Sequence, residues 1–150
     1  HGINLKWMSK QKRHVLSLET SVDFELIGIC SHHSDYRLAW GINKILELEL
    51  TKSDEPFVIQ SKKGTIVSQH SFHVFIDEVD HMEWYLIKNK SEGKFLIPEK
   101  NQIDYFLILR ENILHDLDDL VEQIRESNSV MAAYVFEAAA IPSAELIIFE

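Results

Sequence analysis

The chain has 150 residues, of which 45% are apolar, a single cysteine and a formal net charge of −9. This composition fits one globular domain, and a lone cysteine excludes an internal disulfide framework. The sequence holds no long uninterrupted apolar run, so we expect no membrane span and a protein of the reducing cytoplasm.

Positive charge is concentrated at the start of the chain. Residues 1–13 contain no acidic residue and four basic ones, Lys6, Lys10, Lys12 and Arg13. This arm contributes +4, so residues 14–150 carry −13, and a body of that charge repels nucleic acid. We therefore expect a basic arm, 1–13, without the features of a signal peptide, and one domain, 14–150. Met8 is a candidate native start, which would make residues 1–7 an added segment.

Two strands are predicted before the first helix. Weak alternation of apolar residues over 14–18 predicts one strand, and the apolar run 24–30 predicts a buried second one. Gly28 inside this run predicts the close approach of another backbone. Cys30 at its end predicts a buried, unreactive thiol.

The first helix is predicted over 34–46, after several possible N-cap residues in 31–35. Its core face is formed by apolar residues at helical spacing, Leu38, Ala39, Ile42, Ile45 and Leu46. Gly41 lowers helix propensity, so we expect it to permit close packing on the sheet. Tyr36, Arg37 and Trp40 share another side of this helix and are residue types that anchor interfaces. The alternative is that both aromatic rings only widen the core face.

The middle of the chain predicts consecutive strands joined by short turns, which is typical of an antiparallel sheet. A loop or a short edge strand is expected over 48–56. The strands are expected at 57–60, 65–67, 72–76, 82–88, 95–97 and 103–109. Polar turns at 77–80 and 89–93 separate them, and Pro98 interrupts the last pair.

A second helix is predicted over 112–126, with Asn112 as its N-cap. Its expected apolar face consists of Ile113, Leu114, Leu117, Leu120, Val121 and Ile124. Alternation then predicts a strand over 130–136, which makes 103–136 a strand–helix–strand unit. Residues 138–144 are expected to form a linker, and the apolar tail 146–149 is expected to pack on the body or on a second copy. The predicted fold class is α+β, an antiparallel sheet with both helices mainly on one face.

The segment around Pro98 carries the most distinctive pattern. It reads Ile97-Pro98-Glu99-Lys100-Asn101-Gln102-Ile103-Asp104-Tyr105, with an aspartate inside a predicted strand. It resembles the signature of a bacterial family named IPExxVDY after its pattern. Three residues separate Glu99 from Ile103 where the pattern has two, and Ile103 replaces valine. Segments 24–29, 35–40 with Asn43, and 85–90 also resemble this family, which implies a small cytoplasmic α+β domain without an assigned activity.

Two interpretations of the motif remain open from the sequence. Glu99 and Asp104 could act as acid and base or hold a cation. Alternatively, Asp104 accepts hydrogen bonds from the backbone of the turn 98–101 and fixes its shape. Tyr105 would either use its hydroxyl in the site or be an ordinary half-buried strand residue.

The histidines and acidic residues do not predict a metal site or a cofactor. His32 and His33 are adjacent, and His70 and His73 lie three apart, which places them on opposite faces of a strand. A group of four acids at a turn lacks the glycine of a calcium loop; it consists of Asp77, Glu78, Asp80 and Glu83.

The sequence favours a non-enzymatic protein-interaction or homodimerising module, because none of the usual catalytic motifs occurs in it. Its interaction candidates are Tyr36, Arg37 and Trp40. The alternative is a small-ligand-binding domain or an acid/base enzyme that uses Glu99, Asp104 and Tyr105, next to Pro98.

Overall fold

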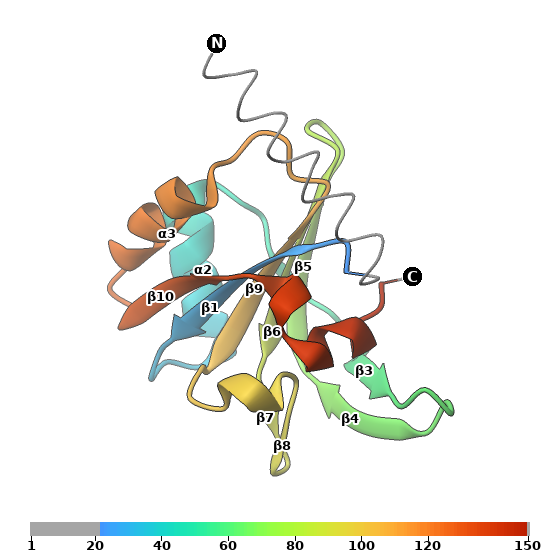
Figure 1. Ribbon diagram of the computed structural model, residues 1–150. Helices are drawn as coiled ribbons and strands as arrows, with labels where there is room; N and C mark the ends of the chain where they lie inside the picture. Colours follow the sequence, from blue (N-terminus) through green and yellow to red (C-terminus); the bar gives the residue numbers. More distant parts are fainter. Residues whose placement is uncertain (1–21, 150) are drawn as a thin grey trace.

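The computed structural model describes residues 22–149, in which six strands form one antiparallel sheet in the order β10-β1-β9-β6-β5-β2 (Figure 1). The strands are β1 Glu25–Cys30, β2 Thr51–Lys52, β5 Phe72–Asp77, β6 Met82–Lys88, β9 Tyr105–Arg110 and β10 Ala132–Phe136. The α+β class with an antiparallel sheet is confirmed. The basic arm 1–13 and the expected strand 14–18 lie outside the described residues.

Both helices lie on one face of the sheet. They are α2 (Asp35–Leu46) and α3 (Leu117–Arg125). The Ser34 hydroxyl caps α2 by accepting from the Arg37 N–H, and Glu47 ends the helix with a left-handed backbone (φ 57°). The buried side chains of both helices pack on alternate sheet residues such as Ile29, Trp84 and Leu107. The predicted helix 34–46 and the one-sided packing are therefore confirmed.

The opposite face of the sheet is covered by shorter elements. These are the hairpins β3–β4 (Phe57–Gln60, Ile66–His70) and β7–β8 (Lys90–Ser91, Lys94–Phe95) and the 3-10 turns η1 (Pro98–Lys100), η2 (Ala138–Ala140) and η3 (Pro142–Leu146). Ile141, Ala144 and Ile147 pack into this second core layer. The apolar tail thus packs on its own body. The segment 138–144, which was expected to be a plain linker, consists largely of η2 and the start of η3.

The strand–helix–strand unit is present as β9–α3–β10, but β9 and β10 are not neighbours. β1 lies between them and pairs antiparallel with both, so that Gly28 is opposite Phe106 on one side and Tyr134 on the other. A Cβ at Gly28 would lie 2.4 Å from the Phe136 ring. The expected backbone approach is therefore wrong, because an aromatic side chain takes the space.

Gly41 permits close packing, but not on the sheet as predicted. A Cβ at this position would lie 2.7 Å from the Ser127 hydroxyl and 3.1 Å from the Ser129 hydroxyl. The glycine therefore lets α2 approach the loop that follows α3, not the sheet. Cys30 is only half-buried, and burial together with the nearby Asp104 raises the pKa of its thiol.

The second helix begins five residues later than predicted. Its N-cap is Asp116, whose carboxylate accepts from the N–H groups of Asp118 (2.9 Å) and Asp119 (3.2 Å). Asn112 instead closes the preceding turn by accepting from the His115 N–H at 2.9 Å. The prediction placed Ile113 and Leu114 in the core, but they are 81% and 55% exposed. Asp116 is the stronger start because two more acids follow it in the first turn, where the helix dipole favours them.

Each edge of the sheet is protected against the addition of another strand. The edge strand β2 has only two residues, and Lys52 in it forms an ion pair with Asp35. At the other edge, the Arg125 guanidinium donates from Nε (3.2 Å) and Nη2 (2.7 Å) to the carbonyl of Ala133 in β10. Short edges and charged groups are the usual means of preventing unwanted strand pairing.

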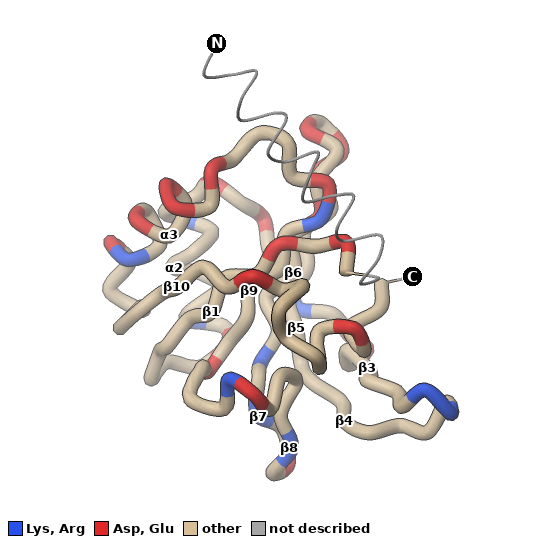
Figure 2. The backbone as a smooth tube through the Cα atoms, viewed as in Figure 1, with Lys and Arg blue, Asp and Glu red and all other residues tan. Residues whose placement is uncertain are grey.

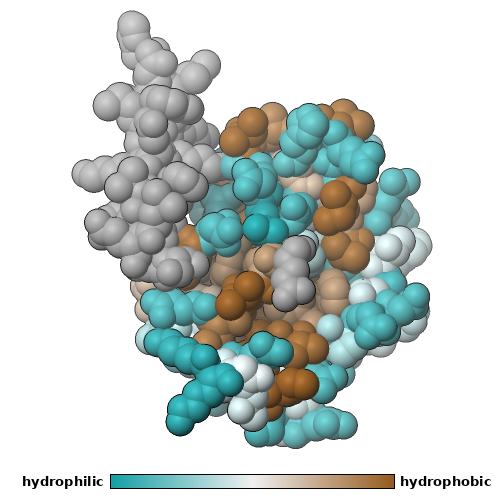
Figure 3. Space-filling view, turned by 90° about the vertical axis from the view of Figure 1, so that its right-hand side faces the viewer, coloured by the Kyte–Doolittle hydropathy of each residue, from teal (hydrophilic) through white to brown (hydrophobic). Residues whose placement is uncertain are grey.

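Exposed hydrophobic side chains on the face of β3–β4 and the C-terminal segment stand in separate groups between hydrophilic ones (Figure 3). They include Val58, Ile66, Val67 and Ile148. Scattered residues of this kind are normal on a protein surface.

Candidate functional site

The motif segment is held in place by Asn89, which is fully buried directly after β6. Its Nδ2 donates to the carbonyls of Lys100 (3.0 Å) and Ile103 (2.8 Å), and its Oδ1 accepts from the N–H of Ile97 (3.0 Å). Its backbone N–H donates to the carbonyl of Asp104 at 3.0 Å. One amide side chain therefore fixes both ends of the turn between Pro98 and β9.

Asp104 braces the chain, but at a different place from the one predicted. Its Oδ2 accepts from the backbone N–H of Ser31 at 2.9 Å, 73 residues away in the sequence. The expected donors in the turn 98–101 are wrong, because Asn89 takes over the fixing of that turn. Asp104 instead holds the segment that connects β1 to α2.

Tyr105 also bonds to the segment that connects β1 to α2. Its hydroxyl donates to the carbonyl of His33 at 2.9 Å, and its ring is buried between the sheet and α2. Tyr105 is a strand residue, as predicted, but it is buried and not half-buried. Burial, with the carboxylates of Asp35 and Asp104 nearby, raises the pKa of Tyr105 to about 12. The phenol is a neutral hydrogen-bond donor at physiological pH.

The raised pKa makes stability depend on alkaline pH. An unfolded tyrosine ionises near pH ~10, whereas folded Tyr105 resists ionisation up to about 12. Its contribution is therefore complete below pH ~10 and is lost as the pH rises toward 12. We expect Tyr105→Phe to reduce the loss of stability across this interval, as measured by urea unfolding at a series of pH values. Tyr134→Phe on the exposed edge is the control, and an equal change in both variants would contradict the assignment.

Glu99 belongs to a different contact. Its carboxylate accepts from the N–H of Ser143 in η3 at 2.9 Å and so joins the motif turn to the C-terminal segment. Burial alone would raise the pKa of Glu99, but the hydrogen bonds from Ser143 and the charge of Lys100 lower it. The acid/base pair of Glu99 and Asp104 is thus not assembled, because each carboxylate is bonded to another part of the chain.

Asp104 and Tyr105 line an open cleft of about 630 Å³ at the end of the sheet. Glu99 is not among its lining residues. The walls come from the β1–α2 connection, the end of β6, the hairpin β7–β8 and the start of β9. Its ionisable lining residues are His32, His33, Asp35, Lys88, Lys90, Glu92, Asp104 and Tyr105. The structure therefore brings Asp104 and Tyr105 of the sequence candidates to one cavity, together with His32 and two lysines that the sequence did not single out as site residues.

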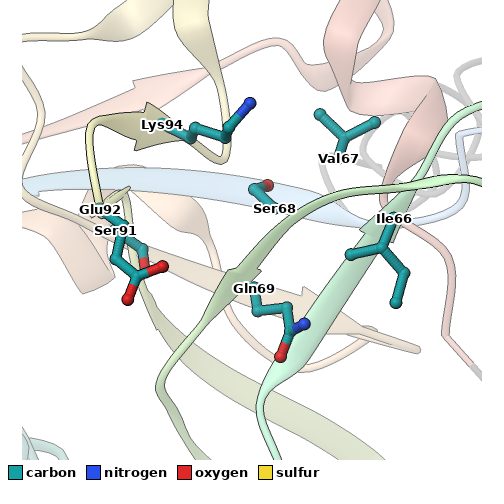
Figure 4. Close-up of a pocket in the computed structure, with 7 residues that line it drawn as sticks. All are labelled: Ile66, Val67, Ser68, Gln69, Ser91, Glu92 and Lys94. Atoms are coloured by element: carbon teal, nitrogen blue, oxygen red, sulfur yellow. The ribbon is translucent and has the colours of Figure 1, made fainter.

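A second hollow of about 320 Å³ lies on the other side of the hairpin β7–β8 (Figure 4). Lys94 and Glu92 reach it from the hairpin, and Ser68 reaches it from β4. The Ser68 hydroxyl lies 2.8 Å from Nε2 of buried His70, whose pKa is lowered by burial. Within residues 22–149, Nδ1 of His70 has no hydrogen-bond partner. The i,i+2 spacing on a strand could have revealed this pair of Ser68 and His70.

The histidines do not form a chelating pair in the described part of the chain. His70 ends β4 and His73 lies in β5, so they are on different strands. His73 packs edge-on against the Tyr36 ring, with 5.6 Å between ring centroids. Among the described residues, no group of three or more His, Cys, Asp or Glu side chains could hold a metal ion.

The aromatic residues of α2 face solvent. Tyr36 is 65% and Trp40 64% exposed, so the interpretation that they widen the core is wrong. The Lys52 ammonium lies 5.0 Å from the centroid of Tyr36, and the Lys44 ammonium lies 4.9 Å from that of Trp40. Arg37 is exposed beside them. We call this surface, formed by Tyr36, Arg37, Trp40, Lys44 and Lys52, the aromatic–cationic patch.

Charge is segregated along the molecule (Figure 2). Lysines gather around the hairpin β7–β8, and acidic residues gather at the opposite end, around the β5–β6 turn and α3. The lysines of the first group are Lys88, Lys90, Lys94 and Lys100. An acidic protein therefore presents a locally basic end next to the cleft, where the local potential differs from that of the whole chain.

Comparison with protein-family models and with curated proteins finds no match for this chain. The resemblance to the IPExxVDY family therefore stays a prediction from the motif. Neither helix in residues 22–149 has the length and apolar character that a membrane crossing requires.

Proposed function

We propose that this domain is a non-enzymatic interaction module that binds an acidic protein partner through the aromatic–cationic patch. The observation that carries the proposal is the exposure of Tyr36 and Trp40, each with a lysine ammonium over its ring. Tyrosine, tryptophan and arginine are the side chains that most often dominate binding energy at interfaces. Folding does not account for these two rings, because neither is buried.

The charge of the patch favours an acidic partner. Arg37 and Lys44 form no ion pair with any described residue, whereas Lys52 is neutralised by Asp35. Two unpaired cations beside two aromatic rings complement carboxylates that flank an apolar or aromatic side chain. The chain as a whole carries −9, so this patch differs in sign from the net charge of the chain.

A second copy of the chain fits the patch less well. An antiparallel pairing of two α2 helices around Trp40 would place Arg37 of one copy opposite Lys44 of the other, and like charges in contact are unfavourable. The apolar tail, the other expected dimer surface, is packed on its own body through Ile147. These two contacts favour a different protein over a homodimer.

Binding of defined polymers tests the proposal. A labelled random copolymer of glutamate and tyrosine should bind more tightly than polyglutamate, because the tyrosines add contacts with Trp40. Binding should weaken when salt rises from about 0.05 M to about 0.5 M, because exposed charges are screened. In Tyr36→Ser/Trp40→Ser the affinity should fall at least about tenfold.

The matched control is Ile113→Ser/Leu114→Ser, which removes two exposed apolar residues away from the patch. Equal binding by both double variants would overturn the proposal. So would a wild-type dimer, seen by sedimentation velocity, that dissociates in Tyr36→Ser/Trp40→Ser, because the patch would then serve self-association.

A further inference from the structure

We propose that the cleft beside the motif binds a small molecule with a phosphate or carboxylate group, held by Lys88 and Lys90. This site does not depend on the aromatic–cationic patch. It gives a role to Asp104 and Tyr105, which the interaction function leaves unused.

The two lysines are placed by the surrounding backbone. Lys88 is directly opposite Tyr105 in the β6–β9 register, so both side chains leave the sheet on the same face. Asn89 lies between the lysines and is fixed in the interior by its hydrogen bonds. Since side chains alternate along an extended chain, Lys88 and Lys90 point away from that interior, and both line the cleft.

The wall across from the lysines is equally fixed. Asp104 accepts a hydrogen bond from the Ser31 N–H, and Tyr105 donates one to the His33 carbonyl. The connection 31–34 is therefore fixed by two hydrogen bonds. This connection leads into the N-terminus of α2, where the helix dipole favours a negative group. The cleft is thus built from segments whose positions are set before a ligand arrives, which is the usual property of small-molecule sites.

Charge pairing within the cleft leaves cations available. In the described part of the chain, neither lysine forms an ion pair, and the Lys90 ammonium lies 5.9 Å from the centroid of the Phe95 ring. Of the three lining carboxylates, Asp35 is neutralised by Lys52, whereas Asp104 accepts from the uncharged Ser31 N–H and keeps its charge. Glu92 at the hairpin tip is the remaining acid. It competes with an anionic ligand for the lysines.

The apolar lining residues indicate what the uncharged part of the ligand should be. Phe95, Ile103 and Tyr105 supply apolar and aromatic surface beside the lysines. A cavity of about 630 Å³ is in the range that accommodates small organic ligands. The chemistry that fits is a ring or short apolar group carrying one anionic substituent. Phenyl phosphate and benzoate represent the phosphate and carboxylate forms of this class, and phenol represents the uncharged ring.

Backbone amide shifts of the full chain provide the test. Titration with phenyl phosphate or benzoate should shift the amides of 31–35, 88–95 and 101–105, and phenol at the same concentration should not. The probe that binds more tightly shows whether the site prefers a phosphate or a carboxylate group. Lys88→Gln/Lys90→Gln should weaken binding at least about tenfold, because two charge-assisted contacts are lost. Glu92→Gln should strengthen it.

The matched control is Lys62→Gln/Lys63→Gln, which removes two lysines at the tip of β3–β4 that line neither cavity. Its affinity should equal that of the wild type. The proposal is overturned if neither anion shifts the cleft amides, if phenol shifts them equally, or if both double variants weaken binding to the same extent. None of these results depends on the polymers that test the patch.

Discussion

Replacement of Asn89 by alanine should lower the free energy of unfolding by roughly 2–4 kcal/mol, because the Ile103 carbonyl and the Ile97 N–H lose this partner at once. The Lys100 carbonyl keeps the N–H of Ile103, at 3.1 Å. The carbonyls of Lys100 and Ile103 and the N–H of Ile97 all bond to this one side chain. Buried polar groups without a partner each cost about 1–3 kcal/mol, and water has little access because Asn89 is fully buried. In a domain of this size, we expect the melting temperature to fall by about 10 °C.

The control for this change is Asn101→Ala. Asn101 lies in the same motif turn but is exposed, so its replacement should change stability by about 0.5 kcal/mol or less. Urea unfolding followed by circular dichroism measures both variants. A loss below about 1 kcal/mol in Asn89→Ala would show that the turn keeps its shape without the amide. Asn89→Ala should also weaken anion binding in the cleft, since the lysines on either side of it would lose their fixed positions.

Most of the strands and the first helix could be predicted because their signals are local. Alternation predicted 72–76, and the polar turn that follows it predicted a returning strand at 82–88, both close to β5 and β6. Helical spacing predicted α2 within one residue. The start of α3 could not be placed this way. Ile113 and Leu114 extend the apolar spacing by chance, and only the three-dimensional structure shows that the chain turns at Asn112 before the helix begins.

The candidate site shows the same limit more clearly. Asp104 and Tyr105 stood out because an acid inside a strand is unusual, but their partners, Ser31 and His33, are 73 and 72 residues distant in the sequence. Asn89 looked like an ordinary turn residue, since asparagine is common in turns. Its burial follows from the return of β9 alongside β6, which no local pattern encodes. Closeness in the sequence likewise predicted that Glu99 and Asp104 form a pair, whereas in the fold Glu99 accepts a hydrogen bond from Ser143.

Replacement of Phe149 by alanine should destabilise the protein by roughly 2–4 kcal/mol, although this residue is the last but one of the chain. Its ring lies 4.6 Å from the Tyr85 ring, 5.4 Å from the Phe57 ring and 5.7 Å from the Phe24 ring, as centroid distances. The Arg110 guanidinium lies 4.7 Å from its centroid on another side. Phe149 therefore joins the hairpin β3–β4, the sheet and the N-terminal end of β1.

The neighbouring Ile148 provides the control, because it is 69% exposed. Ile148→Ala should change stability by about 0.5 kcal/mol or less, whereas Phe149→Leu should retain part of the contribution by keeping apolar volume without the aromatic contacts. Thermal unfolding of the three variants separates the stability that comes from apolar volume from the stability that comes from aromatic contacts. Equal stability of Phe149→Ala and Ile148→Ala would mean that the Phe149 ring contributes nothing to the second core layer. The ordered loss expected here would instead show that the C-terminal end helps to hold β3–β4 on the sheet.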